Sequence, residues 1–202
     1  MADSNLLVYG LRLGSRLHVV DLDGRRLRSF ASADATLSPM AQDLLAQGRI
    51  WCNPQRDEVL VSSKFLQLVE AFQISTGQRV WVDTLRPFRT IALSDRGTRV
   101  TISSGRAGFS LVSSLFSIGD YRLFQTTYES RLDNPAVDTI VTYVYSRRTG
   151  TWFPPQFDVP LLLPLRGAKV LSVEESDRLE IKLHRLAIGG DGTDARPTNR
   201  RK

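Results

Sequence analysis

The chain has 202 residues, of which 42% are hydrophobic, so it is long enough to bury the core of one domain or of two small ones. Its 9 Phe, 5 Tyr and 3 Trp lie largely in runs rich in Val, Leu and Ile, which is typical of β-sheet faces. The net charge of +6 comes almost wholly from arginine, but the arginines are scattered and form no long basic run. Composition therefore predicts an all-β protein, excludes a disordered chain and does not favour nucleic-acid binding.

Cysteine content and the N-terminus restrict the class of protein further. Cys52 is the single cysteine, which excludes an intrachain disulfide and a zinc site built from several thiolates. It follows Trp51 in an expected strand, which favours a small buried residue over a reactive thiol. The start of the sequence lacks a secretory signal, and no run reaches ~18 apolar residues, so no membrane span is expected. A cytoplasmic protein is predicted if Met1 is the true start, and an extracytoplasmic one if a signal peptide lies upstream.

The first half of the chain predicts short strands with one helix between them. Ser38 suits a helix N-cap, Pro39 the first helical position and Gly48 the helix end, so a helix is expected near 39–47. Turn residues, such as Asp23-Gly24 and Thr76-Gly77, separate the strands. The strands expected here are 6–9, 17–22, 25–30, 49–54, 58–63, 65–74 and 78–85.

The second half continues the strand–turn–strand pattern. A hairpin is expected around Asp95-Arg96-Gly97, and further turns at Gly119-Asp120, Gly150, Arg166-Gly167 and Ser176-Asp177. Residues 189–202 contain no large apolar side chain to anchor them and carry a net charge of about +2, which predicts a disordered basic tail. The predicted domain organisation is therefore a partial β-propeller over 1–188 followed by this tail.

One outline recurs at Gly24, Gly77 and Gly150. A large apolar residue stands five positions before each glycine and another three positions after it: Val19, Phe72 and Tyr145 before, and Leu27, Val80 and Phe153 after. The glycine supplies the positive φ of a tight hairpin, and the two apolar residues are expected to face the same side of a sheet.

Three stretches resemble the bacterial six-bladed β-propellers of the broad NHL-like and TolB-like group. They are LHVVDLDGRRLRSF (17–30), GRIWCNPQRDEVLV (48–61) and AKVLSVEESDRLEIKLHRL (168–186). The resemblance implies an all-β fold of about three to four four-stranded antiparallel blades, fewer than close a ring of six. The chain is then a fragment of a longer propeller, or it needs missing blades or a second copy to close the ring.

No catalytic motif or metal site emerges from the residues. His18 and His184 lie in alternating strands without zinc-ligand spacing beside them, which favours surface or buried and hydrogen-bonded histidines. Asp21-Leu22-Asp23-Gly24 lacks the further ligands of a calcium loop and predicts a hairpin turn. The loop SSGRAG (103–108) lacks the Gly-Lys-Ser/Thr of a P-loop, and no nucleophile elbow surrounds its serines. No cofactor is predicted.

The candidate binding residues lie in one polar loop within 126–138, because propeller loops commonly contact ligands. They are Tyr128, Glu129, Arg131, Asp133, Asn134 and Asp138. An ordinary surface loop is the competing interpretation.

The sequence favours a non-catalytic propeller segment that binds a protein, a peptide or a small ligand. The alternative is a propeller hydrolase or lactonase-like enzyme with a metal in the central channel, which would need carboxylates converging around the ring axis. A third hypothesis, a basic polyanion-binding domain, predicts binding that collapses with salt.

Overall fold

The computed structural model describes residues 5–12, 14–103, 108–129, 137–157, 159–165, 169–175 and 179–186. These residues form an all-β fold with one α-helix, α1 (Pro39–Ala46), and one short 3₁₀ turn, η1 (Pro54–Arg56). The strands are β1 (Leu6–Arg12), β2 (Ser15–Val20), β3 (Arg26–Ser32), β4 (Gly48–Asn53), β5 (Glu58–Ser63), β6 (Leu68–Gln73), β7 (Arg79–Thr84), β8 (Ala92–Asp95), β9 (Val100–Ser103), β10 (Phe109–Ile118), β11 (Tyr121–Glu129), β12 (Val137–Ser146), β13 (Thr151–Trp152), β14 (Gln156–Phe157), β15 (Leu162–Pro164), β16 (Lys169–Glu175) and β17 (Leu179–Arg185). The predicted tail, 189–202, lies outside the described residues.

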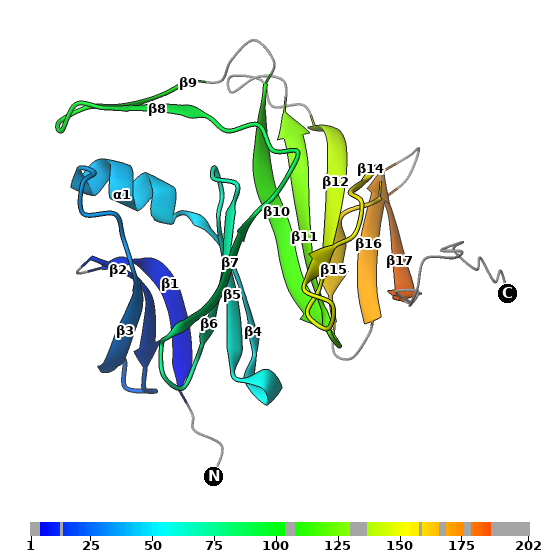
Figure 1. Cartoon of the computed structure of the whole chain (residues 1–202), viewed down its shortest axis with the longest axis horizontal. Helices are drawn as coiled ribbons and strands as arrows, with labels where there is room; N and C mark the ends of the chain where they lie inside the picture. Colours follow the sequence, from blue (N-terminus) through cyan, green and yellow to red (C-terminus); the bar gives the residue numbers. More distant parts are fainter. Residues whose placement is uncertain are drawn as a thin grey trace, which may run out of the picture.

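Four antiparallel meander sheets stand side by side in chain order (Figure 1). They are β1–β3, β4–β7, β10–β14 and β15–β17, and the hairpin β8–β9 lies apart from them across the top of the molecule. In the part of the chain that the structure describes, none of the sheets closes on itself, and the row has two open ends. This is the arrangement of an incomplete β-propeller, which confirms the fold class predicted from the sequence.

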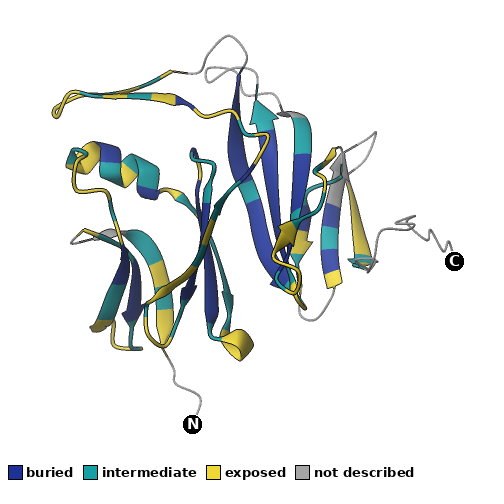
Figure 2. Cartoon of the chain, in the orientation of Figure 1, coloured by how far each residue is buried: buried dark blue, intermediate teal, exposed yellow. Residues whose placement is uncertain are grey.

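Each contact between neighbouring sheets holds its own apolar cluster. The first two sheets share Leu17, Phe30, Val59 and Phe72, and the last two share Phe116, Leu123, Leu162 and Val170. The central contact is the largest and includes Leu60, Val69, Val112, Phe124 and Tyr143. Buried residues accordingly concentrate on the strands in the middle of the row, and exposed ones on its outer strands (Figure 2).

The helix forms as its sequence predicts, except at its end. The Ser38 hydroxyl oxygen accepts a hydrogen bond from the Ala41 N–H at 3.3 Å, and Pro39 occupies the first turn. Gln47, not Gly48, caps the C-terminus, with its N–H donating to the Leu44 carbonyl. Gly48 instead begins β4, where a Cβ atom would lie 1.8 Å from the Ser62 carbonyl oxygen. The glycine is therefore required for strand pairing and not for ending the helix.

The three recurring corners are confirmed as glycine turns. The prediction that the apolar residues before and after each glycine face the same side of the sheet is wrong at two of them. Gly24, Gly77 and Gly150 all have positive φ, between 69° and 78°. The residues before them are buried, whereas Leu27 and Val80 after two of them are 52% and 53% exposed. The pairing register decides which residues face each other: Val19 pairs with Arg28, and Tyr145 pairs with Trp152. In the first two hairpins a β-bulge leaves Leu27 and Val80 without a partner on the opposite strand.

Buried ion pairs join the second sheet to both of its neighbours. Glu70 of β6 is paired with Arg16 of β2 at 2.5 Å, and Glu58 of β5 is paired with Arg122 of β11. Arg28 of β3 adds hydrogen bonds to the carbonyls of residues 74 and 75 in the turn after β6. Several of the scattered arginines thus connect adjacent sheets, a role that their spacing in the sequence does not reveal.

The β8–β9 hairpin is fixed to the helix. Asp95, at the end of β8, accepts hydrogen bonds from the backbone N–H groups of Ser38 at 2.7 Å and Gly97 at 2.9 Å. Ile91 and Ile102 join an apolar cluster with Leu44 of α1. Within the described residues, no helix is long and apolar enough to cross a membrane.

Candidate functional site

The predicted polar loop is only partly described. Arg131, Asp133 and Asn134 lie outside the described residues, and the backbone of Asp138 lies in β12 while its side chain is not described. Tyr128 and Glu129 end β11. The structure therefore describes the side chains of two of the six predicted residues, which are neighbours in the sequence, and the predicted binding role of the loop stays untested.

Tyr128 contacts the segment that follows β7. The Arg89 guanidinium donates a hydrogen bond to the Tyr128 hydroxyl at 2.7 Å and lies 4.7 Å from the centre of its ring. Gly108 packs against Tyr128, since a Cβ there would lie 2.6 Å from the Tyr128 hydroxyl oxygen. These contacts give Tyr128 a structural role in joining β11 to the segment between β7 and β8.

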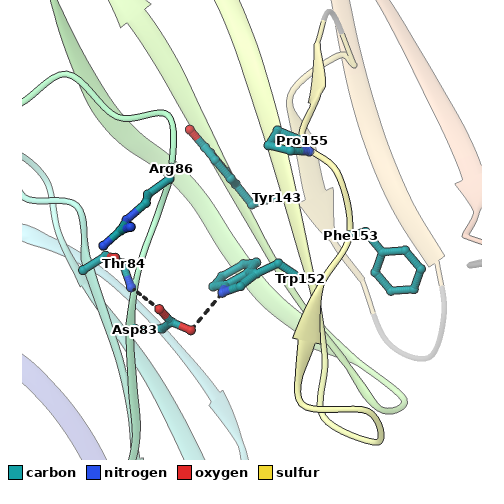
Figure 3. A pocket seen from close by; sticks show the side chains of 7 residues that line it. All are labelled: Asp83, Thr84, Arg86, Tyr143, Trp152, Phe153 and Pro155. Atoms are coloured by element: carbon teal, nitrogen blue, oxygen red, sulfur yellow. Dashed lines mark hydrogen bonds between the residues drawn. The ribbon is translucent and has the colours of Figure 1, made fainter.

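A cavity of about 340 Å³ lies between the second and third sheets. Its walls come from the end of β7 and the residue two positions after it on one side, and from β12, β13 and the segment after β13 on the other (Figure 3). The lining residues are Asp83, Thr84, Arg86, Tyr143, Trp152, Phe153 and Pro155. Its volume is at the low end of the range for small-molecule sites, which suits one or two amino-acid side chains.

Two hydrogen bonds fix the Asp83 carboxylate on the wall of the cavity. The Trp152 indole N–H donates to its Oδ2 at 2.8 Å, and the Thr84 backbone N–H donates to its Oδ1 at 2.7 Å (Figure 3). The first bond bridges the two sheets, because Asp83 belongs to β7 and Trp152 to β13. The indole is thereby held with one edge toward β7.

Tyr143 forms a second bridge across the same gap. Its hydroxyl donates to the Pro87 carbonyl, and burial raises the pKa of the phenol, an effect that a hydrogen bond with Thr126 partly offsets. The hydroxyl is therefore neutral at physiological pH and acts as a hydrogen-bond donor. A catalytic phenolate has no support here.

An aromatic cluster packs against the Trp152 side of the cavity. Trp81 packs on Phe124, Tyr145 and Trp152, with ring centroids 4.9–6.1 Å apart. The Arg122 guanidinium lies 4.4 Å from the centre of the Trp81 ring and is paired with Glu58. The Trp152 ring is consequently held in place from two sides, which gives the cavity a rigid aromatic wall.

Arg86 is the one basic side chain among the described residues that line the cavity. It is exposed, and among the described residues its guanidinium has no hydrogen-bond or ion-pair partner. Figure 3 shows its side chain extending along the chain toward Thr84. A lining guanidinium with no partner among the described residues is suited to a carboxylate or a phosphate on a bound ligand.

The structure also shows the surroundings of the other candidate residues. His18 is buried, with its ring nitrogens 2.8 Å from the Ser29 hydroxyl and 3.1 Å from the Gly10 carbonyl oxygen, and His184 is bonded to the Ser172 hydroxyl. Burial raises the pKa of the half-buried Cys52 thiol, which lowers its reactivity. In the described ranges no three His, Cys, Asp or Glu side chains lie close enough to hold a metal ion.

The cavity residues were not singled out from the sequence. Of the lining residues, only Phe153 belongs to a sequence pattern, as one of the recurring apolar positions after a glycine corner. The available signal is an alternation of large aromatic residues at 143 and 145 with Trp152 opposite, which indicates one aromatic face. Nothing in the spacing shows that Asp83, about 70 residues away in sequence, completes the wall.

Comparisons with known proteins give a distant likeness in fold. No protein-family model and no curated protein matches the sequence. Among solved structures, Hsv2 of Kluyveromyces lactis, a yeast β-propeller, is 12% identical over 89% of this chain and 70% of that one, with a TM-score of 0.26. A form of the same protein with loop 6CD replaced by a Gly-Ser linker is 10% identical over 95% of this chain and 80% of that one, again with a TM-score of 0.26. At these scores the fold assignment depends on the sheet order described above.

Proposed function

We propose that this protein is a non-catalytic binding module and that its ligand is a peptide segment of another protein. The observation that carries the proposal is the cavity between β7 and β12–β13, which is lined by a fixed carboxylate, aromatic rings and an arginine that has no partner in the described part of the chain. A rigid aromatic wall supplies most of the binding energy in such sites, and the polar groups orient the ligand.

The chemistry of the cavity favours binding over catalysis. Its carboxylate already accepts two hydrogen bonds, and its phenol donates one to a backbone carbonyl. None of these groups forms a nucleophile–base pair, the arrangement that acyl transfer or hydrolysis requires.

Three finer predictions from the sequence remain part of the proposal. The stretches 17–30, 48–61 and 168–186 support membership of the bacterial six-bladed propeller group. We also propose that residues 128–138 form a second contact region beside the Arg89–Tyr128 pair, and that 189–202 is a tail separate from the sheets.

The test begins with a display library of random peptides selected on the immobilised full chain. The chain is then labelled with 5-fluorotryptophan, whose ¹⁹F resonances report separately on the 3 tryptophans. We expect selected peptides to shift the Trp152 resonance and to bind about 5-fold or more weakly to a Trp152→Phe variant.

Trp51→Phe is the matched control. Trp51 is also partly buried between sheets, but it does not line the cavity, and its indole N–H has no partner in the described part of the chain. Its replacement is expected to leave peptide affinity unchanged. Failure to select any peptide, or selected peptides that leave the Trp152 resonance unmoved, contradicts the proposed function.

A further inference from the structure

One edge of the second sheet is unoccupied beside the cavity. β7 is the outermost strand of the sheet β4–β7, and within the described residues it pairs with β6 on one side only. It contains no proline or lysine, the residues that commonly protect an edge strand from pairing. The outer edge of the next sheet differs, because Pro154 and Pro155 interrupt it between β13 and β14.

The pairing register shows which backbone groups of β7 face outward. The Leu85 N–H donates to the Gln67 carbonyl at 2.9 Å, and register places Asp83 opposite Val69 and Trp81 opposite Ala71. These are the pairs that exchange hydrogen bonds in an antiparallel ladder, so the alternate residues, Val82 and Thr84, direct their N–H and C=O groups away from β6.

One of these outward groups is already satisfied, and the others have no partner among the residues that the structure describes. The Thr84 N–H is capped by the Asp83 carboxylate at 2.7 Å. The N–H and C=O of Val82 and the C=O of Thr84 are left facing the open edge. A single added residue opposite Val82 could therefore form the paired hydrogen bonds of a β-ladder.

Side chains alternate along β7 so that an added strand would reach the cavity. Trp81 and Asp83 face the third sheet, where both contact Trp152. Val82 faces the opposite way and is 45% exposed. A residue paired with Val82 would share its exposed face, and its two neighbours would point toward Trp152 and the cavity.

The charged residues along this edge of β7 indicate which side chains the added strand should carry. Arg86 lies at the Thr84 end of the edge and is unpaired among the described residues, while Arg79 lies at the other end and is paired with Glu70 at 3.2 Å. The chain as a whole has a net charge of +6. A ligand strand with a carboxylate near Arg86 is thus complementary to this edge.

We propose that an extended peptide adds to the free edge of β7 through Val82, inserts an aromatic side chain into the cavity against Trp152, and pairs an acidic side chain with Arg86. This inference rests on the proposed binding function and specifies its mode. Backbone pairing would supply affinity irrespective of sequence, and the aromatic and acidic residues would supply specificity.

The experiment uses the selected peptides and three variants of the full chain. Val82→Pro removes the outward N–H without removing a hydrogen bond to β6, and we expect affinity to fall about 5- to 10-fold. Val82→Ala keeps the N–H and shortens the side chain, so affinity should change much less. Arg86→Glu should weaken acidic peptides by about 10-fold or more and reverse the salt dependence of binding.

Arg99→Glu is the control for net charge, because Arg99 is exposed at the β8–β9 turn, far from β7 in the fold (Figure 1). It should have a small effect. Circular dichroism and thermal unfolding establish that each variant is folded.

If selected peptides move the Trp152 resonance but bind Val82→Pro and Val82→Ala equally well, strand addition is overturned while the cavity function stands. If peptides enriched by selection lack acidic residues, or if Arg86→Glu binds them as the unsubstituted chain does, the assignment of Arg86 is overturned.

Discussion

Gly77 shows how a single residue can satisfy both a turn and a sheet contact. Its φ of +75° sets the corner between β6 and β7, and its Cα lies against the Phe30 ring of the first sheet. A Cβ atom at this position would be 3.0 Å from the Cβ and Cγ atoms of Phe30. Gly24 forms the equivalent corner between β2 and β3, with φ of +78°, but no atom lies within 4 Å of its added Cβ.

We predict that Gly77→Ala destabilises the protein more than Gly24→Ala does. Both substitutions incur the left-handed backbone cost of about 1–2 kcal/mol, and only the first adds a steric conflict with Phe30. Urea unfolding of the two variants measures the difference directly. Equal losses in the free energy of unfolding would mean that Phe30 moves aside at no cost.

Asp95 makes the hairpin–helix contact sensitive to acid. Hydrogen bonds from the backbone N–H groups of Ser38 and then Gly97 lower the pKa of its carboxyl. A lowered pKa in the folded state contributes stability above the unfolded pKa of about 3.9 and loses it as pH falls through the folded value. The contact between β8–β9 and α1 should therefore weaken only in strong acid.

We predict that Asp95→Asn lowers the urea midpoint at about pH 7 and that this difference from the unsubstituted chain shrinks toward about pH 3. Asp34→Asn is the control, since the Asp34 pKa is lowered by Thr36 alone, within a local turn. It should leave protection of the β8–β9 amides from hydrogen exchange intact. A pH-independent loss in Asp95→Asn would refute the titration argument.

At the scale of whole elements, polar contacts hold neighbouring sheets in a fixed relation. Each face of the second sheet presents one buried glutamate, Glu70 toward the first sheet and Glu58 toward the third. The third and fourth sheets are joined instead by Gln125, whose amide bonds the Pro160 carbonyl and the Leu162 N–H. Apolar packing supplies the area of each contact, and these bonds fix its registration.

We predict that Arg122→Leu costs about 3–5 kcal/mol in the free energy of unfolding, because it leaves the Glu58 carboxylate buried and only partly compensated by Arg147 at 3.5 Å. Adding Glu58→Leu should restore most of that loss. A double-mutant cycle by chemical denaturation gives the coupling energy. Additive losses would show that the two side chains are not energetically coupled.

At the scale of the whole molecule, the outer faces of both end sheets carry exposed apolar side chains. On β15–β17, register aligns Leu163, Leu171 and Leu183 across the three strands, and Ile181 and Leu183 are 65% and 61% exposed. On β1, Leu6 and Val8 are exposed at alternate positions. A sheet with two apolar faces is the pattern of an interior blade, so these faces are suited to contact with further sheets.

We predict that copies of the chain associate through these faces in a concentration-dependent way. Light scattering should show species larger than 22.7 kDa, and Ile181→Lys with Leu183→Lys should return the protein to that mass. Ser94→Lys with Thr101→Lys adds the same charge to an exposed pair on β8–β9 and should leave association unchanged. A monomer at every concentration would contradict the prediction.

The sequence by itself determined the class and order of the elements. Alternating apolar residues, glycine corners and the Ser38-Pro39 signal are local features, and they predict the hairpins and the helix. The open row of sheets is implied instead by the resemblance of three stretches to β-propellers. The sequence did not determine the pairing register, because the bulges in the hairpins around Gly24 and Gly77 shift the pairing by one residue and turn Leu27 and Val80 outward.

The sequence did not determine the site either, for a different reason. Asp83, Tyr143 and Trp152 become neighbours only when two sheets pack face to face, and the role of Arg86 follows from its lack of a partner among the described residues. Local sequence encodes strands and turns, whereas a cavity between sheets is decided by contacts between residues far apart in the chain.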